Sequence, residues 1–119
     1  MSGHPRPIAP TKRKAKPAAG SEAAIQKQII DYLTRIGAVV LRTNSGQIAT
    51  ATGHTIRLGA AGTSDLTALH RGIWYSIEVK KPGNHPTPLQ SAYLERVNAA
   101  GGVGFVATSL DAVMQRIPQ

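Results

Sequence analysis

The chain has 119 residues, carries a formal net charge of +8 and contains no cysteine. This length allows a single domain, and the lack of cysteine excludes disulfides and thiolate metal sites. The histidines are scattered without the spacing of zinc ligands, at positions 4, 54, 70 and 85. Because neither a signal peptide nor a long apolar run is evident, we expect a soluble cytoplasmic protein without membrane association.

Residues 1–20 differ from the rest of the chain in charge. They carry five basic residues and no acid, whereas the remainder carries nine basic and six acidic residues. The segment is also rich in proline, alanine and glycine, which favours disorder, so we expect a disordered basic tail at 1–20 and a folded domain at 21–119. Its candidate phosphate contacts are Lys12, Arg13, Lys14 and Lys16. The alternative is a solubilising leader or a cloning remnant.

Ser21 is a suitable N-cap for a first helix. Apolar residues then recur at helical spacing, at 25, 29, 33 and 36, and predict its buried side. Glu22 lies close to that row and could face the sheet, but the residues alone favour a first-turn acid stabilised by the helix dipole.

After Gly37, residues 38–42 form a short apolar run that we expect to be a central strand. The stretch from 44 to 62 has few core-forming residues, and within it 47–51 and 55–58 could pair as a small hairpin. Arg42, Asn44 and Arg57 are candidate nucleic-acid contacts in this region, and the alternative is an ordinary surface hairpin.

Two strands are predicted at 65–70 and 73–80, joined by a turn at Arg71-Gly72. In the second strand apolar residues alternate with polar ones, so Glu78 and Lys80 share one face while the apolar set packs into the core. A hairpin centred on this turn places Asp65 opposite the Glu78 region. Two carboxylates then converge beside one ammonium group.

This combination suits metal-dependent phosphodiester chemistry. Mg²⁺ is usually bound by one or two carboxylates, water and substrate phosphate oxygens, and such an ion polarises the phosphoryl group and lowers the pKa of bound water. Lys80 could position that water or stabilise the charge that builds on the phosphate. The alternative is an exposed Glu–Lys pair with Asp65 as a turn residue.

The rest of the chain predicts a helix, a strand and a helix. Lys81 lies in the loop after the second strand and is expected to contact phosphate. Thr87, Pro88 and Gln90 form a capping-box pattern, and residues 89, 93, 97 and 100 are expected to form the buried side of that helix. A strand at 103–107 follows, and a right-handed crossover would make it parallel to the strand that ends at Lys80. A final helix runs from Ser109 to Ile117. The predicted fold class is a small α/β sandwich with a central mixed sheet flanked by helices.

Five segments in order resemble the VRR-NUC branch of the PD-(D/E)XK nuclease superfamily: Ser21-Glu22, Arg42-Thr43-Asn44-Ser45-Gly46, Gly62-Thr63-Ser64-Asp65, Ile77-Glu78-Val79-Lys80 and Pro88-Leu89-Gln90. The resemblance covers about residues 21–117, with Ser64 where the superfamily name has proline. It implies a restriction-endonuclease-like sandwich in which Asp65 and Glu78 bind Mg²⁺ or Mn²⁺, with the Val79 carbonyl as a candidate third ligand. Lys80 would orient or activate the attacking water.

The same resemblance implies further roles and a substrate. Glu22 becomes an active-site acid near or on the metal, and Gln90 an accessory residue of the site. Small stand-alone members look like phage or bacterial proteins, which would place this one in a bacterial cell. The implied substrate is branched DNA such as a four-way (Holliday) junction, and symmetric cutting of two strands favours a two-fold dimer. The alternatives are a non-catalytic nucleic-acid-binding module and a restriction-type or general repair nuclease.

Overall fold

The computed structural model describes residues 18–44, 47–49, 51–53, 55–57 and 62–119. The candidate contacts of the basic tail at 12, 13, 14 and 16 lie outside these residues. The elements are, in chain order, α1 (Glu22–Arg35), β1 (Val39–Arg42), β2 (Gln47–Ala49), β3 (Thr55–Arg57), β4 (Leu66–His70), β5 (Ile73–Val79), α2 (Pro88–Ala99), β6 (Val103–Ala107) and α3 (Leu110–Arg116). Each of the predicted helices and strands is present.

The main sheet has four strands in the order β1-β4-β5-β6. β4 is antiparallel to both β1 and β5, whereas β6 is parallel to β5 across the α2 crossover. Arg71 and Gly72, with φ of 51° and 79°, form the β4–β5 turn, and positive φ at both positions matches the right-handed twist of a hairpin. The predicted mixed sheet is therefore confirmed.

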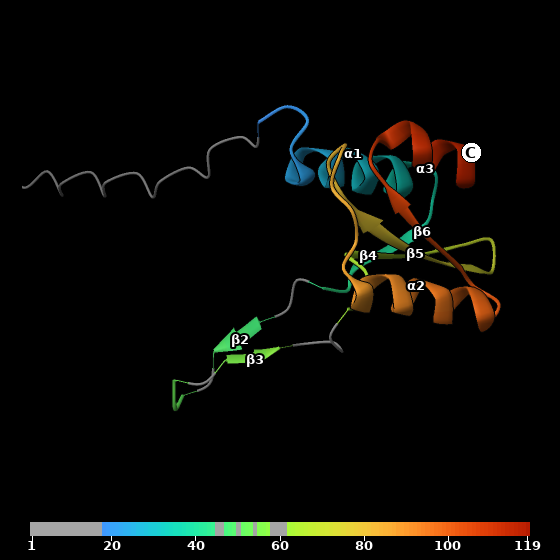
Figure 1. Ribbon diagram of the computed structural model, residues 1–119. Coiled ribbons are helices and arrows are strands. Elements are labelled where there is room, and N and C mark those ends of the chain that lie inside the picture. The colour runs from blue at the N-terminus through green and yellow to red at the C-terminus, as the bar shows by residue number, and fades with distance from the viewer. Residues whose placement is uncertain (1–17, 45–46, 50, 54, 58–61) are drawn as a thin grey trace, which may run out of the picture.

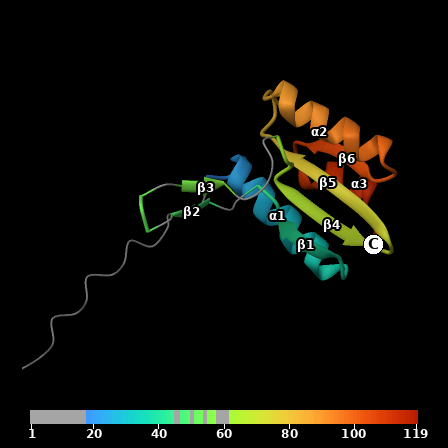
Figure 2. The ribbon, with the colours of Figure 1, turned by 90° about the horizontal axis from the view of Figure 1, so that it is seen from below.

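Helices cover the two faces of the sheet unequally (Figure 1). α1 and α3 lie on one face, where they bury the main core together with Leu66 and Ile77, both fully inaccessible. The hydroxyl of Tyr32 donates a hydrogen bond of 2.7 Å to the carbonyl of Ile117 and joins these two helices. α2 lies alone on the other face, over the β5–β6 half of the sheet, and leaves β4 uncovered there (Figure 2).

This unequal cover explains two wrong expectations. The strand at 38–42 is not central: β1 is an edge strand, and Val39 and Leu41 are 59% and 55% exposed. They lie on the same face of the sheet as α2, but this helix covers β5 and β6 and does not extend to β1. An apolar run does not show whether a helix covers its second face. In α2, Leu89 is 62% exposed and Leu94 is the buried residue, so the expected buried side of that helix is also wrong.

The position of α2 is set by a close backbone approach that apolar periodicity does not report. A Cβ atom at Gly104 would lie 2.8 Å from the carbonyl oxygen of Leu94, so only glycine lets the helix sit this low on β6. β2 and β3 form the predicted hairpin as a separate two-stranded sheet, which lies apart from the main sheet in Figures 1 and 2. None of the helices in the described part of the chain is long and apolar enough to cross a bilayer.

Candidate metal and catalytic site

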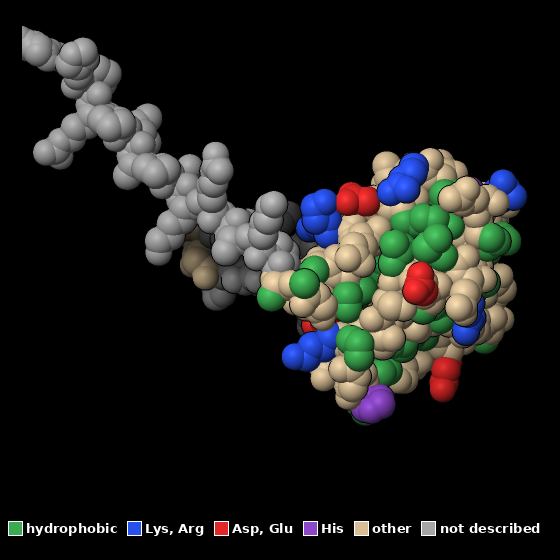
Figure 3. Space-filling view, turned by 90° about the horizontal axis from the view of Figure 1, so that it is seen from above, with side chains coloured by type: hydrophobic (Ala, Val, Ile, Leu, Met, Phe, Trp, Pro, Cys, Tyr) green, Lys and Arg blue, Asp and Glu red, His purple; other side chains and the backbone are tan. Residues whose placement is uncertain are grey.

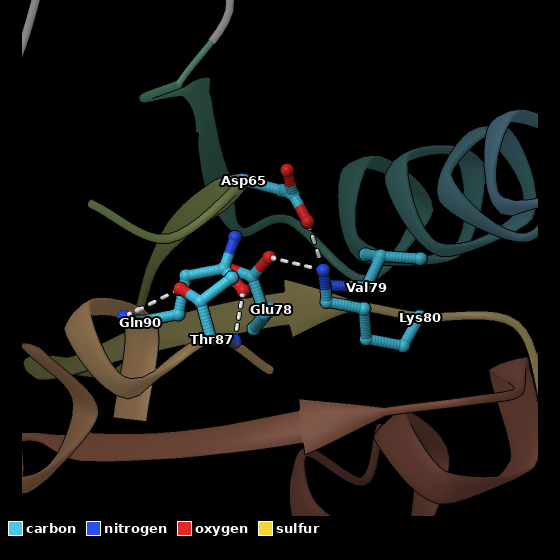
Figure 4. A network of polar contacts seen from close by, with 6 residues as sticks. All are labelled: Asp65, Glu78, Val79, Lys80, Thr87 and Gln90. Carbon is cyan, nitrogen blue, oxygen red and sulfur yellow. Dashed lines mark hydrogen bonds and ion pairs between the residues drawn. The ribbon is translucent and has the colours of Figure 1, made fainter. Parts of the chain in front are cut away.

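The pairing of β4 and β5 brings two carboxylates together at the end of the hairpin away from its turn. Leu66 pairs with Ile77, so the preceding residue, Asp65, falls opposite Glu78 as the sequence predicts. Asp65 Oδ2 accepts a hydrogen bond of 2.8 Å from the Val79 backbone N–H (Figure 4). This bond holds the Asp65 carboxylate at the end of β5, beside Glu78.

Glu78 points toward the α2 face and is only 1% exposed. Its Oε1 lies 3.7 Å from Lys80 Nζ, and the Lys80 side chain is itself 16% exposed. Its Oε2 is buried and has no hydrogen-bond partner in the described part of the chain. An exposed Glu–Lys pair is therefore excluded, because α2 and the Asp65 loop cover this end of the strand.

The environment of Glu78 favours its neutral form. Burial, and next the negative charge of Asp65, raises the pKa of Glu78 from its ordinary 4.5 to about 8, while the Lys80 ammonium acts in the opposite direction. Lys80 therefore does not offset the loss of hydration and the nearby negative charge. A second positive charge at this position would shift Glu78 toward its ionised form.

A chain of hydroxyl groups supports the segment that carries Asp65. Thr43 Oγ1 donates to the Ser64 carbonyl at 2.7 Å, Thr67 Oγ1 donates to Thr43 Oγ1 at 3.2 Å, and the Thr43 N–H donates to the Asp65 carbonyl at 3.0 Å. Sequence reasoning missed Thr67. The signal was its place two residues after Asp65, which puts both side chains on the same face of the strand.

A glycine allows the same segment to pack closely against α2. Gly62 has φ of 85°, and a Cβ atom there would lie 2.6 Å from the Leu89 carbonyl oxygen. The loop before Asp65 therefore touches the first turn of α2, where Gln90 lies. Gln90 completes a capping box: its Oε1 accepts from the Thr87 N–H at 2.8 Å, and its own N–H donates to Thr87 Oγ1 at 3.2 Å (Figure 4). The structural role predicted for Gln90 is thus present, and its accessory role in the site stays a prediction.

The remaining predicted residues lie on other elements and loops of the chain. Glu22 is an exposed acid in the first turn of α1, with Ser21 as the N-cap, and its part in the site stays a prediction. Arg42 ends the edge strand β1, and Asn44 follows it. Lys81 is exposed in the loop after β5. The backbone of Arg57 lies in β3, and its side chain is outside what the structure describes.

The donor set fits a hard divalent cation. Across the described residues, no three His, Cys, Asp or Glu side chains gather, so the protein would contribute the carboxylates of Asp65 and Glu78. Mg²⁺ usually takes its remaining ligands from water, carbonyl groups and phosphate oxygens. The Val79 carbonyl stays a predicted ligand. The unpartnered Oε2 of Glu78 is the buried acceptor that such a cation would satisfy.

Comparison with known proteins agrees with this architecture. No family model and no curated protein matches the chain. A solved structure described as a VRR_NUC domain matches with a TM-score of 0.59 and 24% sequence identity, over 82% of this chain and 97% of that one. The match covers nearly the whole of that chain, so the similarity extends over almost the full length of that domain. The chain therefore has the fold of a VRR_NUC domain, as the resemblance of its five motifs predicts.

Proposed function

We propose that this protein is a metal-dependent DNA endonuclease and that Asp65 and Glu78 hold the cation. The observation that carries the proposal is the buried, unpartnered carboxylate oxygen of Glu78 beside a second carboxylate. Burying such a group without a partner destabilises a fold. A strongly perturbed acid next to a specific charge partner is a candidate functional group.

Each residue of the site has a defined task in phosphodiester hydrolysis. A divalent cation between the two carboxylates would supply a polarised phosphoryl oxygen and a bound water of lowered pKa. The Val79 N–H fixes Oδ2 of Asp65 at the end of β5, and we assign this carboxylate to the cation. Glu78 must lose its proton to become a ligand, and Lys80, held 3.7 Å from it, is placed to orient the attacking water or to stabilise charge on the phosphate.

The charge of the chain suits a nucleic-acid substrate. Its net charge is +8, and cationic side chains bind DNA by releasing counterions from phosphates. On the face seen in Figure 3, lysine and arginine side chains are spread around the margin with acids between them, rather than gathered in one patch. We assign the backbone contacts nearest the acidic pair to Lys81, Arg42 and Asn44, with Arg57 and the basic residues of 1–20 as further contacts.

We further propose branched DNA, such as a four-way junction, as the substrate, and a two-fold dimer as the active form. The support is the motif resemblance together with the VRR_NUC fold. A junction must be cut at two symmetric positions, which a protein with two-fold symmetry achieves with two copies of the same site.

A cleavage panel tests the proposal. Linear duplex, single strand, flap, splayed arm and four-way junction are incubated with the protein in Mg²⁺, in Mn²⁺ and in EDTA. We expect cleavage only with metal, fastest on a branched substrate, and loss of cleavage in Asp65→Asn and Glu78→Gln with binding intact or tighter. Asp31→Asn is the matched control, since that acid lies 56% exposed in an α1 surface pair.

Other outcomes separate the alternatives. Near wild-type nicking by Asp65→Asn or Glu78→Gln contradicts the assigned metal site. Binding without cleavage under every metal condition indicates a non-catalytic nucleic-acid-binding module. Cutting of linear duplex at one sequence indicates a restriction-type nuclease.

A further inference from the structure

A groove of about 500 Å³ lies at the opposite end of α2 and β5 from the acidic pair. Its lining residues are Trp74, Tyr93, Arg96, Val97, Ala100 and Gly102. The four from the α2 segment follow the spacing i, i+3, i+4 and i+7, so they form one side of the last turns of the helix. Trp74 is on β5, on the same face as Glu78. Nothing in the metal site uses these residues.

The Trp74 indole is a fixed platform in this groove. It is 47% exposed, yet its Nε1 donates a hydrogen bond of 2.9 Å to Ser76 Oγ, and Ser76 is fully buried. The ring is therefore held in one orientation with its polar atom satisfied. Gly102 keeps the floor of the groove low, because a Cβ atom there would lie 2.9 Å from Val97 Cγ1 and 3.1 Å from the Trp74 carbonyl oxygen.

The groove combines aromatic rings with a positive charge. Tyr93 adds a second ring, and Arg96 adds a guanidinium from the last turn of α2. None of the lining residues is acidic. Aromatic side chains stack on nucleobases without regard to sequence, and an arginine beside them pairs with phosphate. These are the groups that recognise a nucleotide.

The groove lies within reach of a DNA strand held at the acidic pair. Trp74 and Glu78 are four residues apart on one strand, which corresponds to about 13 Å. Successive nucleotides of one DNA strand rise by about 3.4 Å, so about four stacked steps span the same distance. A base inside a duplex has both faces covered by its neighbours, so only an unpaired base can stack on the indole.

We propose that Trp74, Tyr93 and Arg96 bind an unpaired nucleotide of the DNA substrate, with its base on the indole and its phosphate on the guanidinium. The inference rests on the proposed function, since its ligand belongs to the same nucleic acid that the acidic pair would cut. It extends that function by naming a feature that would distinguish the favoured substrate from other DNA. The favoured DNA has an unpaired base within a few nucleotides of the scissile phosphate, as a branch point or flap provides.

A second copy of this chain is the competing occupant. Val39, Leu69 and Trp74 lie in one cross-strand row, and each is about half exposed. This row forms an apolar surface that continues from the groove toward β1 and could contact a second copy. An isologous contact uses the same patch on both copies. It would therefore bring a second Arg96 to a groove whose lining has no carboxylate to pair with either guanidinium, and this favours the nucleotide.

The single tryptophan of the chain makes the groove directly observable. Full-length protein is titrated in EDTA with a short oligothymidylate while tryptophan emission is recorded. We expect saturable quenching, because the only indole is the proposed platform. Arg96→Gln should weaken this binding. Arg35→Gln, which removes the arginine in the last turn of α1 behind the other face of the sheet, should leave it unchanged.

Anisotropy of a labelled oligothymidylate tests the ring itself. Base–aromatic stacking predicts a loss of affinity of roughly 5- to 150-fold in Trp74→Ala. Trp74→Phe should recover most of the affinity, which a purely structural defect would not allow. Both variants lose the hydrogen bond to the buried Ser76 Oγ and should melt below wild type, so affinities are compared at a temperature at which circular dichroism shows each variant folded.

The outcomes separate this proposal from the proposed function. Binding seen by anisotropy without quenching overturns the groove assignment and leaves the nuclease untouched. Emission that changes with protein concentration in the absence of DNA also overturns it, in favour of a second copy. Quenching accompanied by no cleavage in any metal would retain the groove and remove the nuclease.

Discussion

Glu78→Gln should stabilise the metal-free protein, and the gain should grow with pH. Burial, then the charge of Asp65, raises the pKa of Glu78 from 4.5 to about 8 in the folded chain. The folded state therefore holds this proton more tightly than the unfolded state does. The stability from that difference is fully present below pH 4.5 and is lost as pH rises to about 8. Glutamine keeps the neutral shape at every pH.

The expected change in the free energy of unfolding is large compared with the total stability of a small domain. Each pKa unit corresponds to about 1.4 kcal/mol, so a rise from 4.5 to about 8 corresponds to about 5 kcal/mol. Typical domains have total stabilities of about 5–15 kcal/mol. The advantage of Glu78→Gln should therefore increase by about 1.4 kcal/mol per pH unit across that interval.

Urea unfolding in EDTA at a series of pH values measures this difference. Wild type, Glu78→Gln and the exposed control Asp31→Asn are compared, and then Mg²⁺ is added. Above the pKa of Glu78, Mg²⁺ should stabilise wild type and not Glu78→Gln, because the proposed metal site would exist only in the folded protein with Glu78 ionised. Unfolding free energies that run parallel in wild type and Glu78→Gln across the whole pH range would refute the burial argument.

Three further predictions follow from charges and close contacts. Lys80→Ala should lower turnover on the order of 10²–10³-fold with little change in DNA affinity, whereas Lys81→Ala should weaken DNA binding and leave turnover unchanged. If Lys80→Ala lowered turnover and DNA affinity equally, Lys80 would be a plain phosphate contact. Deletion of residues 1–20 removes five basic residues and should make the slope of log affinity against log salt concentration shallower by about 0.9 per lost phosphate contact. Identical slopes for full-length and truncated protein, from isotherms at several salt concentrations, would exclude a role for the segment in DNA binding. Gly62→Ala should destabilise the fold by more than about 1 kcal/mol and reduce cleavage, because its Cβ would meet a backbone carbonyl of α2 at 2.6 Å. Gly83→Ala, with φ of 91° and nothing within 4 Å, is the matched control for backbone strain alone, and an equal loss of unfolding free energy in the two variants would contradict the steric reason.

Local rules predicted the part of the site that lies within one hairpin. A two-residue turn at Arg71-Gly72 and the two-residue period of strands are enough to place Asp65 opposite Glu78. The capping box of Thr87 and Gln90 is likewise a short-range pattern, and it is present. These features each lie within one hairpin or one helical turn, so local sequence patterns are enough to predict them.

Features set by long-range packing were not predictable in this way. The burial of Glu78 depends on α2 crossing the sheet, and the exposure of β1 depends on the same helix not reaching it. The contact of Gly104 with the Leu94 backbone decides where α2 lies. Alternation along a strand shows which residues share a face, but it does not show which face receives a helix.

The register of the β4–β5 hairpin has a consequence for how active protein should be counted. A slip of one residue would place Ile77 or Val79 opposite Asp65 and would turn Glu78 toward the α1 layer. Such a molecule would keep its helices and much of its sheet, so circular dichroism would count it as folded, yet it could not assemble the acidic pair. Stoichiometric titration with metal would count only correctly paired molecules. The ratio of metal-binding sites to protein chains would then measure strand alignment in a preparation, a property that purity and helix content leave unreported.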